Sequence, residues 1–458
     1  VTNDYAEFAM SRQPNILWLM TDEQRTDSLG CYGSPWVKTP CLDRLAREGV
    51  VFENAITPAP ACVPARVSIA TGKMPHETGC WHNEWRAEEP LAFLTHHFAD
   101  AGYQTAGFGK MHFNAKNKAF QTQEEITLSS HVDYFDYAKI YDESEFDVVK
   151  YPGDKSRWIL GGKFPAPLEE TSEHIVASKA LDWLAGRDTQ KPFLLKVSFN
   201  GPHTPVVPPA PYDTMIREGD IRFPDNTMHF PADHPEWTSR LIQSGYADAS
   251  RLSMAQQRAM RRYYYGYASF LDMEFGRVIS YLEKENILDN TIIAFTSDHG
   301  THLGDFGLIQ KQTFFDPVIR VPLIFRYPNA MRSGTRLSSP ASTASLLPTL
   351  LDAAGISPPA DVAPSLTSSS DTDKASPVMS EFMYTPQHIR RDDKFMMIRD
   401  RSWKLSFVLD AYPRSAMLTA TNDRNERDRI HEKSGVADLL FGHSMAHYAG
   451  QGNTPAPT

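Results

Sequence analysis

A cysteine and an arginine four residues apart, Cys62 and Arg66, mark the segment whose residue types most clearly allow chemistry. Pro64 lies between them, and proline is tolerated in the first turn of a helix, where its missing N–H has no partner to lose. In a helix that begins at Cys62, both side chains lie on one face, about 6 Å apart along the axis. Because a helix N-terminus favours anions, the spacing predicts a nucleophile held against a negatively charged group. The alternative is a buried structural cysteine in a strand-to-helix turn.

Two carboxylates and one imidazole form a second set of candidate residues. Asp22 follows an apolar run near the start of the chain, and Asp298 and His299 follow another near its middle. Carboxylate oxygens suit a hard divalent cation such as Ca²⁺, Mg²⁺ or Mn²⁺. The alternative is a helix-capping aspartate beside a surface histidine. The residue types therefore predict a metal site if the fold brings both segments together.

Cationic and imidazole side chains make up a third set, namely Lys110, His112, His203 and Lys311. Each histidine alone is equally consistent with a solvated loop residue. Together with Arg66, these groups supply the positive charge and hydrogen bonds that a tetrahedral anion needs. The set predicts an anion site next to the metal.

Apolar runs that end in polar or glycine-rich turns predict the strands that position these residues. The runs are residues 15–21, 105–109, 193–199, 291–297 and 321–325, which we expect to be buried parallel strands. Helical patterns cover residues 42–47, 171–185, 254–285 and 344–354. Strands that alternate with helices predict an α/β fold with a large mixed, mainly parallel sheet sandwiched by helices. Since ligands bind at the carboxyl ends of such strands, the three sets should meet there.

Composition shifts divide the chain into an N-terminal tail (1–13), a catalytic domain (14–357), a linker (358–376) and a small C-terminal α+β domain with a polar tail (377–458). Within the catalytic domain, residues 204–250 are rich in proline and read as an insertion over one face. Short strands are expected at 378–384, 395–399 and 402–409, and disorder at 450–458.

The net charge of −10 over 458 residues leaves no basic surplus for a nucleic-acid partner. No apolar stretch approaches the roughly 20 residues that span a bilayer, so no membrane association is expected. Four cysteines are too few for a disulfide scaffold at this length. These features favour a bacterial cytoplasmic protein, or a periplasmic or secreted one if an export signal has been removed.

Residues 62–66 match the C-x-P-x-R signature of the type I sulfatases, a family within the alkaline phosphatase superfamily. Further segments of this chain resemble the family's first strand, its following helix and its later active-site segments: residues 14–22, 39–49, 107–112, 202–205 and 296–300. The resemblance covers the chain from about residue 14 to residue 355. It implies an alkaline-phosphatase-like fold and hydrolysis of sulfate monoesters of an aryl or sugar alcohol, with release of inorganic sulfate.

The resemblance also implies a modified nucleophile. In this family a separate maturation enzyme, formylglycine-generating or cysteine-oxidising, converts the motif cysteine, here Cys62, to formylglycine, which is used as its hydrate. One hydroxyl of the hydrate would attack sulfur, and the second would allow the sulfate to leave. A thiolate lacks that second hydroxyl.

Roles for the remaining residues follow from the same resemblance. One divalent cation, Ca²⁺ or alternatively Mn²⁺ or Mg²⁺, would be bound by Asp22, Cys62, Asp298 and His299. Arg66 would hold the modified side chain, and Lys110 would contact the nucleophile and the substrate. His112 would assist formylglycine, His203 would act on the leaving group, and Lys311 would bind a sulfate oxygen.

Two departures from the family pattern leave alternatives open. Glu23 stands where many members carry a second aspartate, so Glu23 is a possible further metal ligand. His299 stands where many members have asparagine, a histidine shared with phosphonate monoester hydrolases. A formylglycine-dependent phosphonate monoester or phosphate diester hydrolase is therefore the second hypothesis. A non-catalytic protein on the same fold is the third.

Two clusters of polar and aromatic residues are candidates for recognition of the organic part of a small-molecule or carbohydrate sulfate ester. The first comprises Trp81, His82, Asn83, Trp85 and Arg86, and the second comprises His229, His234 and Trp237. Both could stack on a ring, or they could be structural turns. A homo-oligomer is possible.

Overall fold

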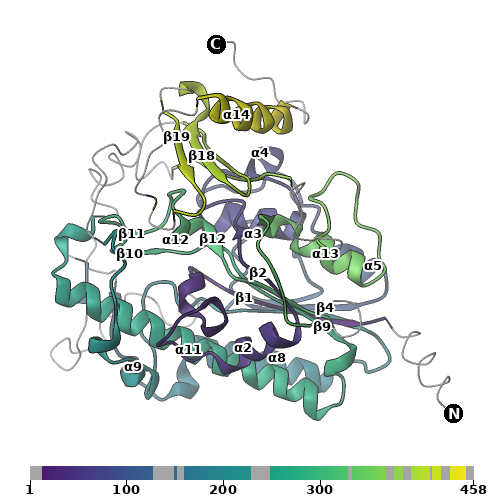
Figure 1. Cartoon of the computed structure of the whole chain (residues 1–458). Helices are drawn as coiled ribbons and strands as arrows, with labels where there is room; N and C mark the ends of the chain where they lie inside the picture. Colours follow the sequence, from purple (N-terminus) through teal and green to yellow (C-terminus); the bar gives the residue numbers. More distant parts are fainter. Residues whose placement is uncertain are drawn as a thin grey trace.

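The computed structural model describes residues 13–126, 149–151, 159–227, 248–327, 333–367, 376–384, 393–412, 415–423, 426 and 434–449. An eight-stranded sheet forms the middle layer of these residues, and helices cover both of its faces (Figure 1). The α/β architecture expected from the sequence is confirmed. The predicted tail at 1–12, the cluster at His229, His234 and Trp237, and residues 450–458 lie outside the described residues.

The large sheet has the strand order β14-β2-β13-β9-β1-β8-β4-β5. Its strands are β1 (Asn15–Thr21), β2 (Val50–Phe52), β4 (Gln104–Gly109), β5 (Thr122–Glu124), β8 (Phe193–Ser198), β9 (Thr291–Ser297), β13 (Leu323–Arg326) and β14 (Thr335–Leu337). Strands β9, β1, β8, β4 and β5 run parallel to one another. Their carboxyl ends therefore meet at one edge, where Asp22, Lys110 and Asp298 follow.

One predicted strand is wrong in direction. Residues 321–325 were expected to form a parallel strand, but β13 runs antiparallel to both β9 and β2. Pro322 divides the run, because proline has no N–H to donate to a ladder. The residues before it belong to β12 (Arg320–Val321), which pairs in another sheet.

Alternate side chains of β1 belong to the two hydrophobic cores. Leu17 and Leu19 pack in one core with α2, α8 and α11, whereas Ile16, Trp18 and Met20 pack in the other with α3, α5 and α13. The helices are α2 (Pro40–Glu48), α3 (Cys62–Thr71), α4 (Pro75–Thr78), α5 (Thr95–Asp100), α8 (Ser172–Gly186), α9 (Tyr212–Met215), α11 (Met254–Lys284), α12 (Asp316–Ile319) and α13 (Leu346–Ala353). Because β1 is buried on both sides, it reads as a continuous apolar run.

Short strands and turns complete the catalytic part. They are β3 (Ala55–Ile56), β6 (Val149–Lys150), β7 (Ile159–Gly161), β10 (His302–Leu303), β11 (Ile309–Gln310) and β15 (Ala341–Ser342). Short 3₁₀ helices of this part are η1 (Thr26–Ser28), η2 (Gly30–Tyr32), η4 (Leu168–Glu170), η5 (Glu218–Asp220), η6 (Ala249–Arg251), η7 (Leu288–Asn290) and η8 (Thr343–Ser345), whereas η9 (Leu409–Ala411) belongs to the C-terminal region. The described part of the predicted insertion contains α9 and η5.

The C-terminal region forms a separate four-stranded antiparallel sheet, as the expected α+β region requires. Its strands are β16 (Val378–Phe382), β17 (Phe395–Arg399), β18 (Trp403–Val408) and β19 (Met417–Ala420). The predicted polar tail contains a helix, α14 (Ser434–Ala449), which lies over this sheet (Figure 1). Phe441 of α14 stacks on Tyr412 with ring centroids 3.8 Å apart. The domain boundaries drawn from composition stay a prediction.

No helix among the described residues is both long enough and apolar enough to cross a bilayer. The compartment expected from the sequence stays a prediction.

Candidate active site

Helix α3 carries the candidate nucleophile at its first residue. Ala61 is extended and Cys62 begins the helix, which ends at Gly72 with a φ of +71°. The N–H of Val63 donates to Asn83 Oδ1 at 3.0 Å, so a residue outside the helix caps its N-terminus. Cys62 is 2% exposed. The helix thus presents the Cys62 side chain to a buried space at the carboxyl ends of the strands.

Arg66 lies at the centre of the site and joins its separate loops. Its Nε donates to Asp298 Oδ2 at 2.7 Å and its Nη2 to Asp22 Oδ2 at 2.9 Å. Its Nη1 donates to Ser198 Oγ at 3.0 Å and to the Lys110 carbonyl at 2.6 Å. The guanidinium therefore fixes the positions of two candidate metal ligands.

The structure brings together the four residues of the predicted metal site, which are Asp22, Cys62, Asp298 and His299. Each offers one ligand atom, and these atoms all lie within 4.8 Å of one another. Cys62 Sγ lies 3.8 Å from Asp22 Oδ1 and 3.3 Å from His299 Nε2. His299 Nδ1 lies 2.8 Å from the Gly300 carbonyl, which accepts its hydrogen bond and leaves Nε2 facing the cluster. Two carboxylates and one imidazole fit a hard divalent cation.

Glu23 belongs to a neighbouring group instead of the first one. Its carboxylate forms a second set of close ligand atoms with Asp22 and His203. Its Oε1 pairs with Lys311 Nζ at 2.7 Å and with His203 Nε2 at 3.4 Å. Glu23 has a φ of +61°, and its carbonyl accepts a hydrogen bond from Tyr264 Oη at 2.5 Å. The structure thus places Glu23 between the candidate leaving-group acid and a candidate anion-binding lysine.

Two lysines bring positive charge to the nucleophile. Lys311 Nζ lies 2.9 Å from Cys62 Sγ, and Lys110 Nζ lies 2.6 Å from Asp22 Oδ2. Burial has the largest influence on the pKa of Cys62 and raises it, as does the Asp22 carboxylate. Lys311 and Lys110, together with His299, outweigh both, so the pKa of Cys62 lies well below its usual value.

The carboxylate and imidazole of the metal cluster are shifted by burial and by their charged neighbours. Burial raises the pKa of Asp22, but Lys110 and His203 hold it well below its usual range. Burial lowers the pKa of His299, but the Asp298 carboxylate outweighs it and raises the pKa to about 9. Without a bound cation, the cluster therefore favours a charged carboxylate next to a charged imidazole.

The two remaining histidines lie on loops that follow strands. His203 follows β8, its side chain is 24% exposed, and its Nδ1 lies 2.6 Å from the Thr204 carbonyl. His112 follows β4 with a φ of +52°, and its backbone N–H donates to Glu125 Oε1 at 2.9 Å. The Nδ1 of His112 has no hydrogen-bond partner among the described residues. The structure thus places His203 beside the cluster through Glu23, and His112 two residues from Lys110.

Sequence reasoning missed two residues that hold this geometry. Ser198 belongs to no recognisable motif. It is the last residue of β8, and its hydroxyl accepts a hydrogen bond from Arg66. Its place at the carboxyl end of a predicted strand was the signal that could have found it. Asn83 was named in a cluster that was either a substrate contact or a structural turn, without a role at α3, and the structure shows it accepting the Val63 N–H. Because Asn83 is 20 residues from Val63, no local spacing rule connects the two.

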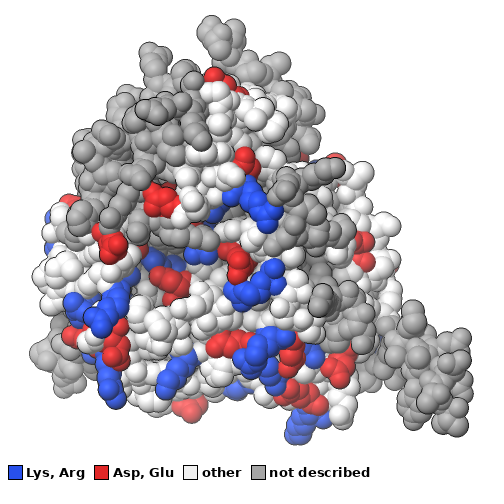
Figure 2. Space-filling model, in the orientation of Figure 1, with Lys and Arg blue, Asp and Glu red and all other residues white. Residues whose placement is uncertain are grey.

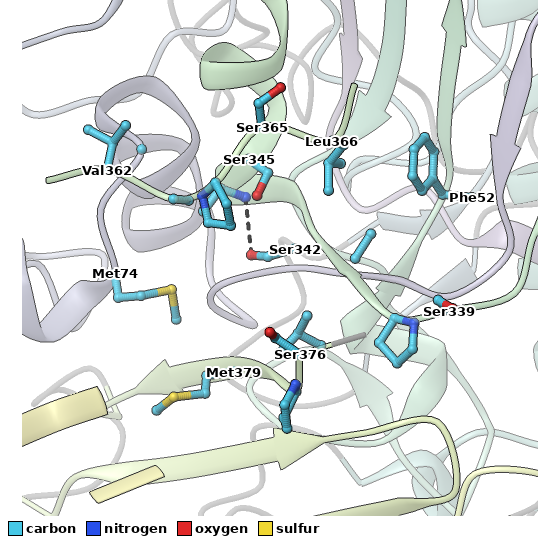
Figure 3. Close-up of a pocket in the computed structure, with 18 of the residues that line it drawn as sticks. Phe52, Met74, Ser339, Ser342, Ser345, Val362, Ser365, Leu366, Ser376 and Met379 are labelled. Atoms are coloured by element: carbon cyan, nitrogen blue, oxygen red, sulfur yellow. Dashed lines mark hydrogen bonds between the residues drawn. The ribbon is translucent and has the colours of Figure 1, made fainter. Parts of the chain in front are cut away.

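A pocket of about 430 Å³ lies at the other end of α3, between Gly72, η8 and β16. Figure 3 shows Met74, Met379, Val362 and Leu366 around it, with several serine side chains between them. None of the described residues that line it belongs to the candidate catalytic or metal set. This pocket is therefore separate from the active site.

Comparison with known proteins agrees with the geometry. The sulfatase family profile matches residues 14–356, and the profile of the C-terminal region of N-sulphoglucosamine sulphohydrolase matches residues 304–444. The chain belongs to the sulfatase family. It is therefore a sulfuric ester hydrolase by descent, as the signature around Cys62 predicts.

Individual relatives of this sulfatase differ in their organic substrates. An arylsulfatase of Clostridium perfringens is 28% identical over 454 residues, which cover 91% of this chain and 92% of the relative. An N-acetylglucosamine-6-O-sulfatase of Bacteroides thetaiotaomicron is also 28% identical, over 407 residues, which cover 77% of this chain and 70% of the relative.

Solved structures share the fold of this sulfatase. A protein in complex with its substrate D-glucosamine-2-N,6-O-disulfate has a TM-score of 0.76 and 23% identity, and the match covers 97% of this chain and 99% of that one. A phosphonate monoester hydrolase from Silicibacter pomeroyi has a TM-score of 0.77 and 23% identity, with 97% and 96% covered. At these identities the likeness shows the fold alone.

Proposed function

We propose that this sulfatase hydrolyses a carbohydrate sulfate ester, with a nucleophile derived from Cys62 and one bound divalent cation. The observation that carries the proposal is the environment of Cys62 Sγ. Lys311 Nζ, His299 Nε2 and Asp22 Oδ1 lie 2.9, 3.3 and 3.8 Å from it. A structural cysteine has no need of a buried lysine, a histidine and a carboxylate at such distances.

The ion that we propose is Ca²⁺. It would be bound by Asp22, Asp298, His299 and the side chain of residue 62. Bound there, a hard divalent cation supplies Lewis acidity and lowers the pKa of a coordinated hydroxyl. Arg66 keeps the two carboxylates in place through its 2.7 and 2.9 Å hydrogen bonds. The positive charge of Arg66 also reduces the repulsion between Asp22 and Asp298 before a cation arrives.

Conversion of Cys62 to formylglycine by a maturation enzyme would supply a hydrated aldehyde in place of the thiol. The hydrated residue 62 is then a neutral group whose hydroxyl protons need acceptors, and Asp22 Oδ1 lies 3.8 Å from the Sγ that these hydroxyls replace. Lys311 and Lys110 surround the same position with ammonium groups, which stabilise the negative charge of a sulfate group held there. Both lysines are nearly buried, so water screens their charge little.

His203 is the residue placed to give a proton to the departing alcohol. Its Nδ1 faces the Thr204 carbonyl, and its Nε2 faces Glu23 Oε1 at 3.4 Å. A general acid must carry the proton that the departing alcohol takes up, and Glu23 Oε1 is the carboxylate oxygen that pairs with His203 Nε2. In this assignment Glu23 orients His203 and Lys311 and does not bind the cation.

The carbohydrate part of the proposal is supported by the relatives. One curated relative is named for a 6-O-sulfated amino sugar, and one structural neighbour was solved with a disulfated glucosamine. The His82–Trp85 segment lies close to the nucleophile, because Asn83 touches Val63. His82 and Trp85 are partly exposed and offer rings to a sugar face.

A phosphonate monoester hydrolase remains the second candidate, because His299 fits that class and such an enzyme shares the fold. Matched kinetics on an aryl sulfate and an aryl phosphonate ester, together with a panel of sulfated monosaccharides, test the choice. We expect the highest kcat/KM for a sulfate ester. A higher value for the phosphonate would replace the proposed function with the second candidate.

The panel needs protein in which residue 62 is known chemically. Mass spectrometry of the tryptic peptide that contains Cys62 should show the mass of the aldehyde or its hydrate in active preparations. A sample that turns over while retaining only the thiol mass would refute the formylglycine assignment and leave the family membership untouched.

A further inference from the structure

A pocket of about 570 Å³ lies outside the candidate active site. Its walls come from segments that are far apart in sequence, namely the loop after β1 with η1 and η2, residues 222–226, helix α11 and the neighbourhood of β12. None of the described lining residues belongs to the candidate catalytic or metal set. Figure 2 shows basic and acidic side chains close together in a hollowed part of the face between α11 and α12.

Basic side chains outnumber acidic ones in this pocket and in the ion pairs behind it. Among the described residues, the charged lining and its ion-pair partners comprise Arg25, Arg222, Arg261, Arg320, Arg336, Arg399 and Lys404 against Asp27, Glu53, Asp305, Asp316 and Glu426. The whole chain carries a net charge of −10. An excess of positive side chains in one pocket of a negatively charged protein attracts anions to that pocket, whereas the rest of the surface repels them.

Arg261 is a buried charge of the pocket whose hydrogen bonding is incomplete. The residue is 1% exposed, and its Nη2 lies 3.4 Å from Asp305 Oδ2. That carboxylate is already paired with Arg25 at 2.5 Å. The Nε of Arg261 has no hydrogen-bond partner among the described residues. A buried guanidinium with incomplete hydrogen bonding is costly, and an oxyanion is the ligand that would complete it.

Aromatic rings lie beside these guanidinium groups. Trp36 and Tyr265 line the pocket with their ring centroids 6.1 Å apart. Two guanidinium groups lie over the ring of Phe223. The Cζ of Arg258 is 4.9 Å from the ring centroid, and the Cζ of Arg261 is 5.3 Å from it. Asn226, also in the lining, is 3% exposed, and its Oδ1 lacks a hydrogen-bond partner among the described residues. Rings, amide and guanidinium together suit a polar ligand with both an anionic group and a ring face.

We propose that this pocket is a second, non-catalytic site for an oxyanion of the sulfate or carboxylate type. The anion is either free in solution or carried on a saccharide, and the recognition chemistry is the same in both. Arg222 and Arg261 would bind its oxygens, and Trp36 and Tyr265 would flank the group that bears it. The assignment holds whether or not Cys62 is the nucleophile.

The test uses Trp36 as a local reporter. The full chain is labelled with 5-fluorotryptophan, the Trp36 ¹⁹F resonance is assigned from a Trp36→Phe variant, and sodium sulfate is titrated against sodium chloride of equal ionic strength. We expect a saturable shift of the Trp36 resonance with sulfate. Arg222→Gln should raise the midpoint by about tenfold, the loss expected for one charged hydrogen bond. Arg261→Gln should remove the shift.

Arg217→Gln is the matched control, because Arg217 is an exposed arginine outside the pocket lining, and its midpoint should equal that of the wild type. If the buried Arg261 variant fails to fold, the exposed Arg222 variant still decides the matter.

A second experiment distinguishes the two sources of the anion. The Cys62→Ala protein is titrated with glucosamine 6-sulfate, with sodium sulfate and, as a control without the anionic group, with glucosamine. A lower midpoint for the sugar ester than for sulfate assigns the pocket to a saccharide, and an equal midpoint assigns it to the free ion. A Trp36 resonance that neither ligand moves, or an Arg222→Gln midpoint equal to that of the wild type, overturns the proposal.

Discussion

Arg66 shows at the scale of one residue how a motif position acquires its role. The motif spacing predicted that Arg66 would meet the nucleophile on one helix face, but four of its hydrogen bonds go to two carboxylates, a hydroxyl and a carbonyl. Its direct contact with the residue 62 side chain stays a prediction. All four of these partners lie at or next to strand ends, so the helix-face rule alone could not have revealed them.

Removing the side chain at the nucleophile position tests the role of residue 62. Cys62→Ala should lower kcat by at least about a thousandfold, because no other group can form the bond to sulfur. Cys31→Ser, a cysteine outside the site, should keep wild-type activity. Unchanged turnover in the Cys62 variant would show that another group is the nucleophile.

Removal of the metal tests the ligand cluster. Chelation should abolish activity and lower the midpoint of thermal unfolding, because four buried groups lose their common partner. Added Ca²⁺ should restore both, with Mn²⁺ and Mg²⁺ compared in parallel. Full activity in a preparation shown by elemental analysis to be metal-free would remove the cation from the site.

At the scale of elements, the strands that position the site were predicted well and the supporting turns were not. β1, β9 and β17 have the predicted bounds, because buried apolar runs bounded by polar turns are strong local signals. Helix α14 was taken for a polar tail, since its apolar residues are too scattered to mark one face. The cap of α3 depends on a loop 20 residues away, which local patterns do not encode.

The cap of α3 is testable by substitution at Asn83. Asn83→Ala should cost about 1 kcal/mol of unfolding free energy, the usual loss for a missing helix cap, and lower kcat by disturbing Cys62. Asn83→Asp keeps an acceptor oxygen and should recover most of both losses. If the alanine variant instead raises KM and leaves stability and kcat alone, Asn83 is a substrate contact and not a cap.

The junction of α11 with α2 should make stability depend on pH. Asp272 accepts the N–H groups of Cys41 and Leu42 at 3.0 and 2.8 Å, and burial raises its pKa from 3.8 to about 7. The folded state therefore binds a proton between about pH 4 and pH 7 that the unfolded state has lost. Stability should fall as pH rises through this window and level off above it.

Chemical denaturation at a series of pH values measures this contribution. Asp272→Asn cannot ionise, so its unfolding free energy should lose the decline between pH 4 and pH 7. Asp289→Asn, an exposed carboxylate, should retain the wild-type slope. Equal slopes in the wild type and the Asp272 variant would contradict the assignment.

At the scale of the whole molecule, a buried ionic cluster joins the C-terminal sheet to helix α12. Arg399 and Lys404, from β17 and β18, pair with Asp316 at 2.8 and 3.2 Å, and Lys404 also pairs with Glu426. Composition suggested a boundary near residues 358–376 but gave no sign of this cluster, whose acidic members lie 22 and 88 residues from Lys404. Such distant pairings follow from the tertiary fold and not from local sequence.

Breaking this cluster should loosen the C-terminal region. Lys404→Met leaves Asp316 and Glu426 with less compensation in a buried place, and we expect a loss of about 3 to 5 kcal/mol in denaturant unfolding. Arg401→Met, which removes an exposed arginine of the same hairpin, should change stability little. A Lys404 variant as stable as the wild type would mean that the cluster contributes nothing net.

The central position of β1 has a consequence for synthesis of the chain on the ribosome. β1 ends at Thr21, but its partner β9 begins at Thr291, so the first strand made waits for some 270 residues before the sheet can close around it. At about 5 to 20 residues per second, that interval is roughly 15 to 60 s. Cys62 is buried in the finished fold but is already synthesised for most of this time, so the proposed maturation enzyme would have this interval in which to reach it.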